Sequence, residues 1–216
     1  MTIYCAPLSG SDGSLAVYSL LRYAFNIEYG GEFPEIKKTP NGKPYFPARR
    51  DIHFSLSHSR THVLCALSGE PVGADIESPR LISERAIKFF CSPAELALFD
   101  PLDIWVLKES YIKLVGETLA MIKKPQFSRC GDSIIAPDIG ELGGFGGKIS
   151  PDFGELGGFE GKIFPDIGEH SRVISRLYRI EDCRAAVCSL VEKPPDSVEL
   201  VIGSDCLLLG SADISY

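Results

Sequence analysis

The stretch Trp105–Lys113, WVLKESYIK, places one carboxylate and two ammonium groups along an otherwise apolar segment. Asp100 followed by Pro101 is typical of a helix N-terminus and Gly116 of a helix end, so the sequence predicts one helix between them. A spacing of four residues puts Glu109 on the same face as the tryptophan that opens the stretch. A surface helix with an i,i+4 acid–lysine pair is the alternative interpretation, so this motif alone assigns no chemistry.

A second acidic motif lies upstream, in PVGADIES at residues 71–78. Alternation along a strand puts Asp75 and Glu77 on the same face as Gly73, with apolar residues on the other face. The two carboxylates would then lie roughly 7 Å apart, at two residue rises. Like charges repel, so the pair needs a cation or full solvation, and Mg²⁺ suits one or two carboxylates and a phosphate. Two solvated acids at a strand end are the alternative interpretation.

Two further motifs precede these acids. The loop TPNGKPYFP at residues 39–47 predicts a tight turn that holds Lys43 on a stiff backbone. The segment from His53 to Ser68 alternates and then becomes apolar, which predicts a hairpin that contains the sequence FSLSHS. His58 could donate a hydrogen bond to an anion or be a plain turn histidine. The histidines here do not predict a zinc site, because their spacing points them to opposite faces and no further ligand completes a set.

The amino-acid composition excludes several classes of protein. The chain has 216 residues, 44% of them apolar and 24% charged, which is typical of a globular protein with a real core. A net charge of -7 argues against general nucleic-acid binding. The sequence offers no apolar run of membrane-spanning length and no signal-peptide pattern, and its seven cysteines form no CxxC pair. We therefore expect a cytoplasmic protein with reduced thiols.

The other expected elements alternate strands with short helices. Periodicity and capping signals predict an early strand (3–6), helices (14–25, 83–90 and 93–99) and a final hairpin (172–180 and 183–191). The tail (198–208) either adds an edge strand or packs on the surface. Residues 137–170 differ in kind, because two glycine-rich units and a fragment repeat with a period of 14. Too few units are present for a solenoid, so we interpret this segment as an inserted, irregular loop.

Taken together and in this order, GKPYF, FSLSHS, VGADIE, FCSPAE and WVLKESYIK resemble the 4'-phosphopantetheinyl transferases of the surfactin-synthetase-activator type. The resemblance is strong over about residues 40–130 and weak over the final hairpin. It implies an α/β (α+β) fold of two pseudo-symmetric halves, each an antiparallel sheet packed on a long helix, with the active site in the cleft between them. We expect the halves at residues 1–78 and 79–216, with the repeats inserted in the second.

The resemblance also implies roles for individual residues. Asp75, Glu77 and Glu109 match acids that hold a divalent cation, Mg²⁺ or Mn²⁺, on the diphosphate of coenzyme A. The coenzyme-binding positions are Lys43, Ser57, His58, Lys108 and Lys113, and the catalytic positions are Glu109, Lys113 and Glu95. Which of the two glutamates accepts the substrate proton stays open.

The implied reaction moves 4'-phosphopantetheine from coenzyme A to a serine hydroxyl of an acyl or peptidyl carrier protein and releases adenosine 3',5'-bisphosphate. We expect a cytoplasmic monomer that takes part in fatty acid, polyketide or nonribosomal peptide biosynthesis. One alternative is an impaired transferase-like fold that binds coenzyme A or a carrier protein, and another is a magnesium-dependent phosphodiesterase. The chain departs from the family in the 14-residue repeats and in an N-terminal part that is short of basic residues.

Overall fold

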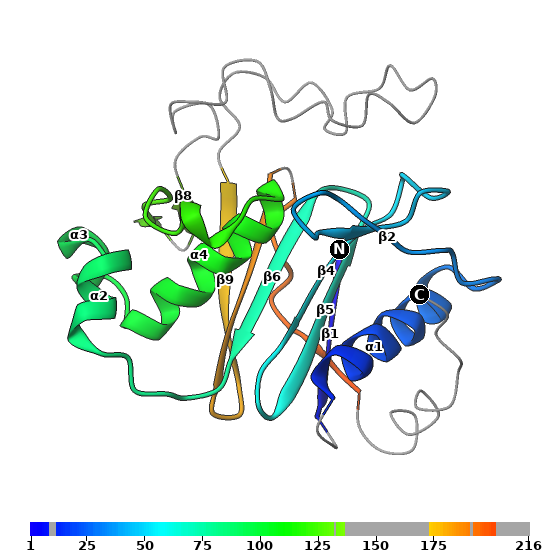
Figure 1. Ribbon diagram of the computed structural model, residues 1–216, viewed down its shortest axis with the longest axis horizontal. Coiled ribbons are helices and arrows are strands. Elements are labelled where there is room, and N and C mark those ends of the chain that lie inside the picture. The colour runs from blue at the N-terminus through cyan, green and yellow to red at the C-terminus, as the bar shows by residue number, and fades with distance from the viewer. Residues whose placement is uncertain (9–11, 132, 137–172, 191, 202–216) are drawn as a thin grey trace, which may run out of the picture.

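The computed structural model describes residues 1–8, 12–131, 133–136, 173–190 and 192–201, which form a mixed α/β fold (Figure 1). The predicted insertion at 137–170 lies outside these residues. The helices are α1 (Gly13–Glu28), α2 (Glu84–Phe90), α3 (Pro93–Leu96) and α4 (Pro101–Val115), with a 3-10 turn, η1 (Leu119–Met121). The strands are β1 (Thr2–Pro7), β2 (Lys37–Lys38), β3 (Pro44–Tyr45), β4 (His53–His58), β5 (His62–Ser68), β6 (Val72–Glu77), β7 (Ser128–Cys130), β8 (Ser133–Ala136), β9 (Val173–Ile180), β10 (Cys183–Ser189) and β11 (Glu199–Leu200).

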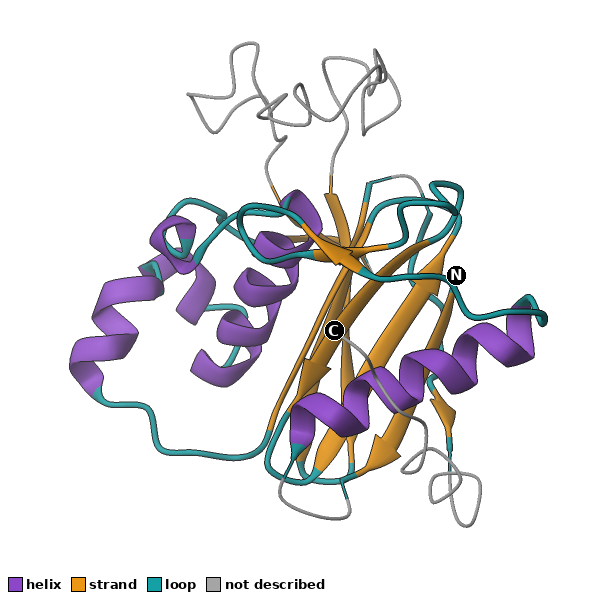
Figure 2. Cartoon of the chain, turned by 45° about the vertical axis from the view of Figure 1, so that its right-hand side comes forward, coloured by secondary structure: helices purple, strands orange, loops and turns teal. Residues whose placement is uncertain are grey.

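The first sheet has the order β11-β1-β5-β4 and is covered on one face by α1 (Figure 2). The Asp12 carboxylate accepts a hydrogen bond from the Leu15 backbone N–H at 3.0 Å and so caps the start of α1. The helix buries Leu20, Leu21 and Phe25 against the sheet. β1 runs antiparallel to β5 but parallel to β11, so the tail adds an edge strand and the sheet is not wholly antiparallel.

The second sheet has the order β6-β10-β9-β8-β7, and α4 packs across β6 and β10 (Figure 1). The helix has the ends that the sequence predicts, because Pro101 is its first residue and Gly116 closes it in the left-handed conformation at φ 71°. The Asp100 side chain, however, makes no capping hydrogen bond. The core under α4 includes Ile104, Leu107 and Tyr111.

The faces of the two sheets that turn away from the helices share one apolar cluster. β6 contributes Val72, Ala74 and Ile76 to it, as alternation predicts, and so directs its other residues toward α4. The two sheets do not divide at the expected boundary after residue 78. β6, which precedes this boundary, pairs with β10 in the second sheet, and β11, which follows it, pairs with β1 in the first sheet. The edge of β4 meets β6, where the Ser55 hydroxyl accepts a hydrogen bond from the Ala74 N–H at 2.9 Å.

Candidate active site

Close packing of α4 on β6 positions the predicted acids. A Cβ atom built on Gly73 would come within 1.9 Å of the Ser110 carbonyl oxygen and within 2.4 Å of the Leu114 nitrogen. Only a residue without a side chain fits there, so the helix backbone rests directly on the strand. Asp75 and Glu77 follow on the same face of β6, and Glu109 and Lys113 lie one turn apart on α4. The fold therefore brings the two sequence motifs together.

Lys113, Asp75 and Ser57 form a closed hydrogen-bonded triangle. The Lys113 ammonium donates to Asp75 Oδ1 at 2.7 Å and to Ser57 Oγ at 2.9 Å, and the Ser57 hydroxyl donates to the same Oδ1 at 2.7 Å. Asp75 is only 5% exposed, whereas the Lys113 side chain is 30% exposed. Two of the three ammonium donors are thus fixed, and the cation is held at the edge of the site.

Glu77 is held through one carboxylate oxygen. Its Oε1 accepts hydrogen bonds from the Trp105 indole N–H at 3.1 Å and from the Arg80 guanidinium at 3.3 Å. Arg80 also lies 4.9 Å from the centroid of the Trp105 ring. Burial, followed by the charge of Asp75, raises the pKa of Glu77. Trp105 and Arg80 are therefore site residues that the motif analysis did not assign.

Of the acids at this site, Glu109 has the carboxyl pKa that its surroundings raise most. Burial, followed by the negative charges of Asp75 and Glu77, raises the pKa of its carboxyl to about 7, although the positive charges of Lys113 and Arg80 act in the opposite direction. A carboxyl with a pKa near 7 can exchange a proton under physiological conditions, as a general base must.

The three acids fit a divalent cation in charge and in donor type. Among the described residues, no three Asp, Glu, His or Cys side chains stand close enough to enclose a metal ion. In the same part of the chain, Asp75 Oδ2 is buried without a hydrogen-bond partner, and the negative charge of Asp75 raises the pKa of Glu77 and that of Glu109. Carboxylate oxygens are the ligands that Mg²⁺ prefers. The repulsion between the acids and the orphaned Asp75 oxygen would both be relieved by such an ion.

Lys108 and Glu95 do not line this site, contrary to the prediction. Lys108 is 0% exposed and Glu95 1% exposed, and they pair with each other at 3.1 Å. The Glu95 oxygens also accept hydrogen bonds from Ser92 and from the Phe127 N–H. The physical reason is helical geometry, because neighbouring residues on a helix point about 100° apart, so Lys108 faces the core when Glu109 faces the site. The pair joins α3 and α4 to the chain at residue 127.

Lys43 and His58 occupy two other places. The Lys43 ammonium donates to the Leu114 carbonyl at 2.9 Å, at the end of α4, and burial lowers its pKa to about 8. It thereby satisfies an open carbonyl at the C-terminus of the helix. His58 is exposed, and its ring lies over Gly13, where a Cβ would come within 2.7 Å of Nδ1. Of the predicted coenzyme-binding residues, the structure thus joins only Ser57 and Lys113 to the acids.

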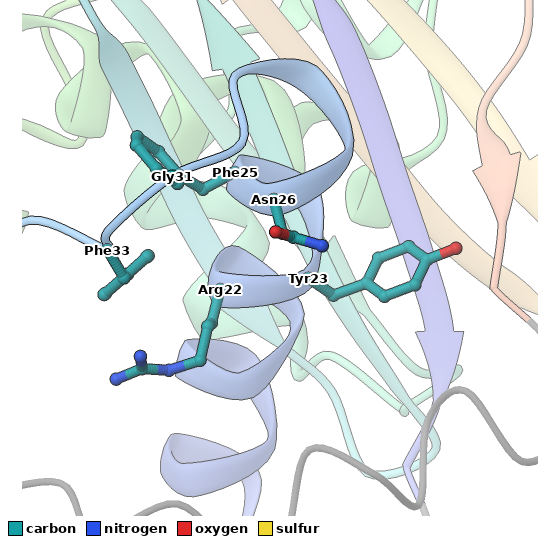
Figure 3. Close-up of a pocket in the computed structure, with 6 residues that line it drawn as sticks. All are labelled: Arg22, Tyr23, Phe25, Asn26, Gly31 and Phe33. Atoms are coloured by element: carbon teal, nitrogen blue, oxygen red, sulfur yellow. The ribbon is translucent and has the colours of Figure 1, made fainter.

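A separate hollow of about 310 Å³ lies beside the second half of α1 (Figure 3). Its lining residues are Arg22, Tyr23, Phe25, Asn26, Gly31 and Phe33. The Arg22 guanidinium lies 4.4 Å from the centroid of the Phe33 ring and so packs on an aromatic face. The hollow contains none of the predicted site residues, and we assign it no role in the site.

Comparison with known sequences shows which proteins the segment with the acidic cluster is similar to. Residues 71–144 match the family model of the 4'-phosphopantetheinyl transferase superfamily. The predicted resemblance to the 4'-phosphopantetheinyl transferases is confirmed. The matched segment carries all three acids together with Lys113, Trp105 and Arg80.

Individual phosphopantetheinyl transferases match over a longer or similar stretch. The chain is 37% identical over 90 residues to the 4'-phosphopantetheinyl transferase Sfp of Bacillus subtilis (strain 168), an alignment that covers 37% of this chain and 40% of the relative. It is 36% identical over 120 residues to the 4'-phosphopantetheinyl transferase gsp of Aneurinibacillus migulanus, covering 49% of this chain and 47% of the relative. The chain thus spans less than half the length of these curated relatives.

Proposed function

We propose that this protein transfers 4'-phosphopantetheine from coenzyme A to a serine hydroxyl of an acyl or peptidyl carrier protein and releases adenosine 3',5'-bisphosphate. The observation that carries the proposal is the convergence of Asp75, Glu77, Glu109 and Lys113 at the contact of β6 with α4, within the segment that matches the family. These groups combine acids for a hard cation with an ammonium for a phosphate oxygen.

The reaction is a displacement at phosphorus. The serine oxygen forms a bond to the β-phosphorus of coenzyme A, the bond from that phosphorus to the bridging oxygen breaks, and the electron pair leaves with adenosine 3',5'-bisphosphate. Glu109 takes the serine proton, because it lies at the acidic cluster whereas the Glu95 oxygens are already occupied in the core. Lys113 directs its remaining donor at a phosphate oxygen. Asp75, Glu77 and Glu109 would hold Mg²⁺, which neutralises diphosphate charge when bound.

The decisive experiment is incubation of the protein with coenzyme A, Mg²⁺ and an apo carrier protein, followed by intact mass measurement of the carrier. A gain of one phosphopantetheine on the carrier supports the proposal. A carrier of unchanged mass contradicts it. In that case coenzyme binding alone would indicate a transferase-like binding protein, and cleavage of a model phosphodiester would indicate the phosphodiesterase.

Asp75→Ala is expected to abolish the effect of Mg²⁺ on coenzyme A binding. It removes the most buried metal ligand, so the Kd for coenzyme A in Mg²⁺ should rise at least about tenfold, to the value measured in EDTA. Isothermal titration with and without Mg²⁺ measures both values. Glu32→Ala removes the same charge from an exposed position and should change neither Kd. Unchanged Mg²⁺-dependent affinity in Asp75→Ala would exclude this strand as a metal site.

We also propose that the carrier docks at residues 117–129. Carrier proteins of this kind are acidic around the modified serine, so an enzyme with net charge -7 must offer local positive charge. Lys123 and Lys124 are exposed, and the Lys123 ammonium lies 3.9 Å from the ring centroid of Phe89, which is 57% exposed. Ile122, which precedes these lysines in the sequence, is buried in the core. Phe89 therefore supplies apolar area beside the lysines.

Replacing Lys123 and Lys124 by glutamate is expected to raise the KM for the carrier by about tenfold at low salt and to flatten its salt dependence. The Kd for coenzyme A should stay constant, because the two lysines lie outside the acidic cluster. Lys37→Glu with Lys38→Glu makes the same charge change on the exposed strand β2 and serves as the control. Equal carrier kinetics in the two double variants would move the docking site elsewhere.

We propose further that the protein works as a monomer in the cytoplasm and has no nucleic-acid partner. The six cysteines in the described residues are free thiols, as a reducing compartment favours. Within the same residues, no helix combines the length and apolarity that a membrane crossing requires. The net charge of -7 opposes binding to a polyanion.

A further inference from the structure

We propose that Trp105 is a positioning residue that aims the Glu77 carboxylate at the divalent cation, and that Arg80 balances the charge of Glu77 while the cation is absent. This inference rests on the metal site of the proposed function and concerns two residues that both donate a hydrogen bond to Glu77 Oε1. Both hydrogen bonds recorded for Glu77 in the described structure fall on that single oxygen. Oε2 is the oxygen left to meet a ligand.

Packing contacts hold the Trp105 ring in place independently of its hydrogen bond to Glu77. It is the only tryptophan of the chain, it is partly buried against the core, and its ring lies 5.1 Å from the Phe90 ring at 77°. The indole N–H is a neutral donor with one hydrogen. A hydrogen bond from it therefore fixes the direction of the carboxylate without cancelling the charge that attracts a cation. Hydrogen bonds to the side chains that bind a metal ion typically have a large effect on its affinity.

Arg80 has the opposite electrostatic effect. Its side chain is 44% exposed, its guanidinium lies against the Trp105 ring, and its positive charge lowers the pKa values of Glu77 and Glu109. A cation at that place repels an incoming metal ion and offsets the negative charge of the acids. Trp105 and Arg80 therefore affect metal affinity with opposite signs, although both donate to the same oxygen.

The test measures binding of Mn²⁺ to the protein alone, by electron paramagnetic resonance of the free ion. Trp105→Phe keeps an aromatic ring against Phe90 and removes the N–H, so the Kd for Mn²⁺ should rise about tenfold. Arg80→Ala should lower the Kd about threefold. Arg85→Ala removes the same charge from an exposed position of α2 and should leave the Kd unchanged. The midpoint of thermal unfolding without metal reports whether each variant is folded.

A double-mutant cycle separates positioning from general packing. In a Glu77→Gln background, Trp105→Phe should have no further effect on Mn²⁺ affinity, because the oxygen that it aims is no longer a charged ligand. Equal Kd values for the original chain and Trp105→Phe, additive effects in the cycle, or weaker Mn²⁺ binding by Arg80→Ala would each overturn the inference. Absence of Mn²⁺ binding by the original chain would instead overturn the metal site on which the inference rests, and carrier modification would then be judged by the mass measurement.

Discussion

Gly73→Ala is expected to destabilise the protein by about 3 kcal/mol or more and to abolish the active site with it. The added methyl would lie 1.9 Å from the Ser110 carbonyl oxygen and 2.4 Å from the Leu114 nitrogen, both of them helix backbone atoms. No side-chain rotation relieves such a contact, so α4 must move away from β6. A loss of this size is a large part of the 5–15 kcal/mol that typically holds a domain together. Any shift of α4 also separates Glu109 from Asp75.

Urea denaturation followed by tryptophan fluorescence measures this loss, because Trp105 lies on the helix that must move. Gly69→Ala is the matched control. It lies outside the left-handed region in the turn before β6, and a Cβ built there meets no atom within 4 Å. The control should change the free energy of unfolding by less than about 0.5 kcal/mol. Equal stabilities of the two variants would show that β6 and α4 are not in direct backbone contact.

Gly73 illustrates how much of the fold the sequence predicts. Alternation in VGADIE placed a glycine and two acids on one face of a strand, and the structure turns that face toward α4. The ends of α4 were likewise predicted, because proline at the start and glycine at the end act locally. These features depend on periodicity and backbone conformation, which a sequence displays directly. The contact between the two elements was inferred from the family resemblance, not from either motif.

The roles of Lys108 and Glu95 could not be predicted in the same way. In sequence, Lys108 is as close to Glu109 as any residue can be, and a charged side chain at this place suggests contact with the ligand. In the structure both charges are buried and form an ion pair with each other, because α3 and residue 127 close over that side of α4. Only the tertiary arrangement decides which face of the helix is covered. Buried ion pairs are rare enough that a sequence offers no general signal for them.

Arg80 and Trp105 were missed for a related reason. Arg80 lies three residues beyond Glu77, past the end of β6, where strand alternation no longer predicts direction. Trp105 was correctly placed on the face of Glu109 but was interpreted as an apolar anchor. Its partner proved to be Glu77, on another element. An indole has both an apolar ring and one polar donor, and a sequence cannot show which of the two decides its position.

Glu109→Gln is expected to reduce the rate of carrier modification by about a thousandfold or more. Loss of a general base typically accounts for an effect of about this size. The amide keeps the volume of the side chain but cannot accept the serine proton and is a poor ligand for Mg²⁺. Transfer measured by intact mass at saturating coenzyme A and carrier gives the loss. Glu32→Gln makes the same chemical change at an exposed position outside the acidic cluster and should keep normal turnover. Near-normal transfer by Glu109→Gln would exclude the assigned role.

The same variant is expected to be more stable than the original chain at pH 8 in the absence of Mg²⁺. The pKa of Glu109 is raised from 4.5 to about 7 in the folded state, so the folded chain holds this proton more tightly than the unfolded chain. Its contribution to stability is present below pH 4.5 and is lost as the pH rises through about 7. Glutamine carries no charge at any of these pH values.

The gain in the free energy of unfolding should therefore be absent at pH 4 and reach no more than about 2 kcal/mol at pH 8, since partial exposure screens the charge. Urea denaturation at both pH values measures it, and a variant that is less stable at pH 8 would contradict the view that Glu109 is held charged at the expense of stability. Loss of transfer together with a gain in stability distinguishes a functional carboxylate from one that merely supports the fold.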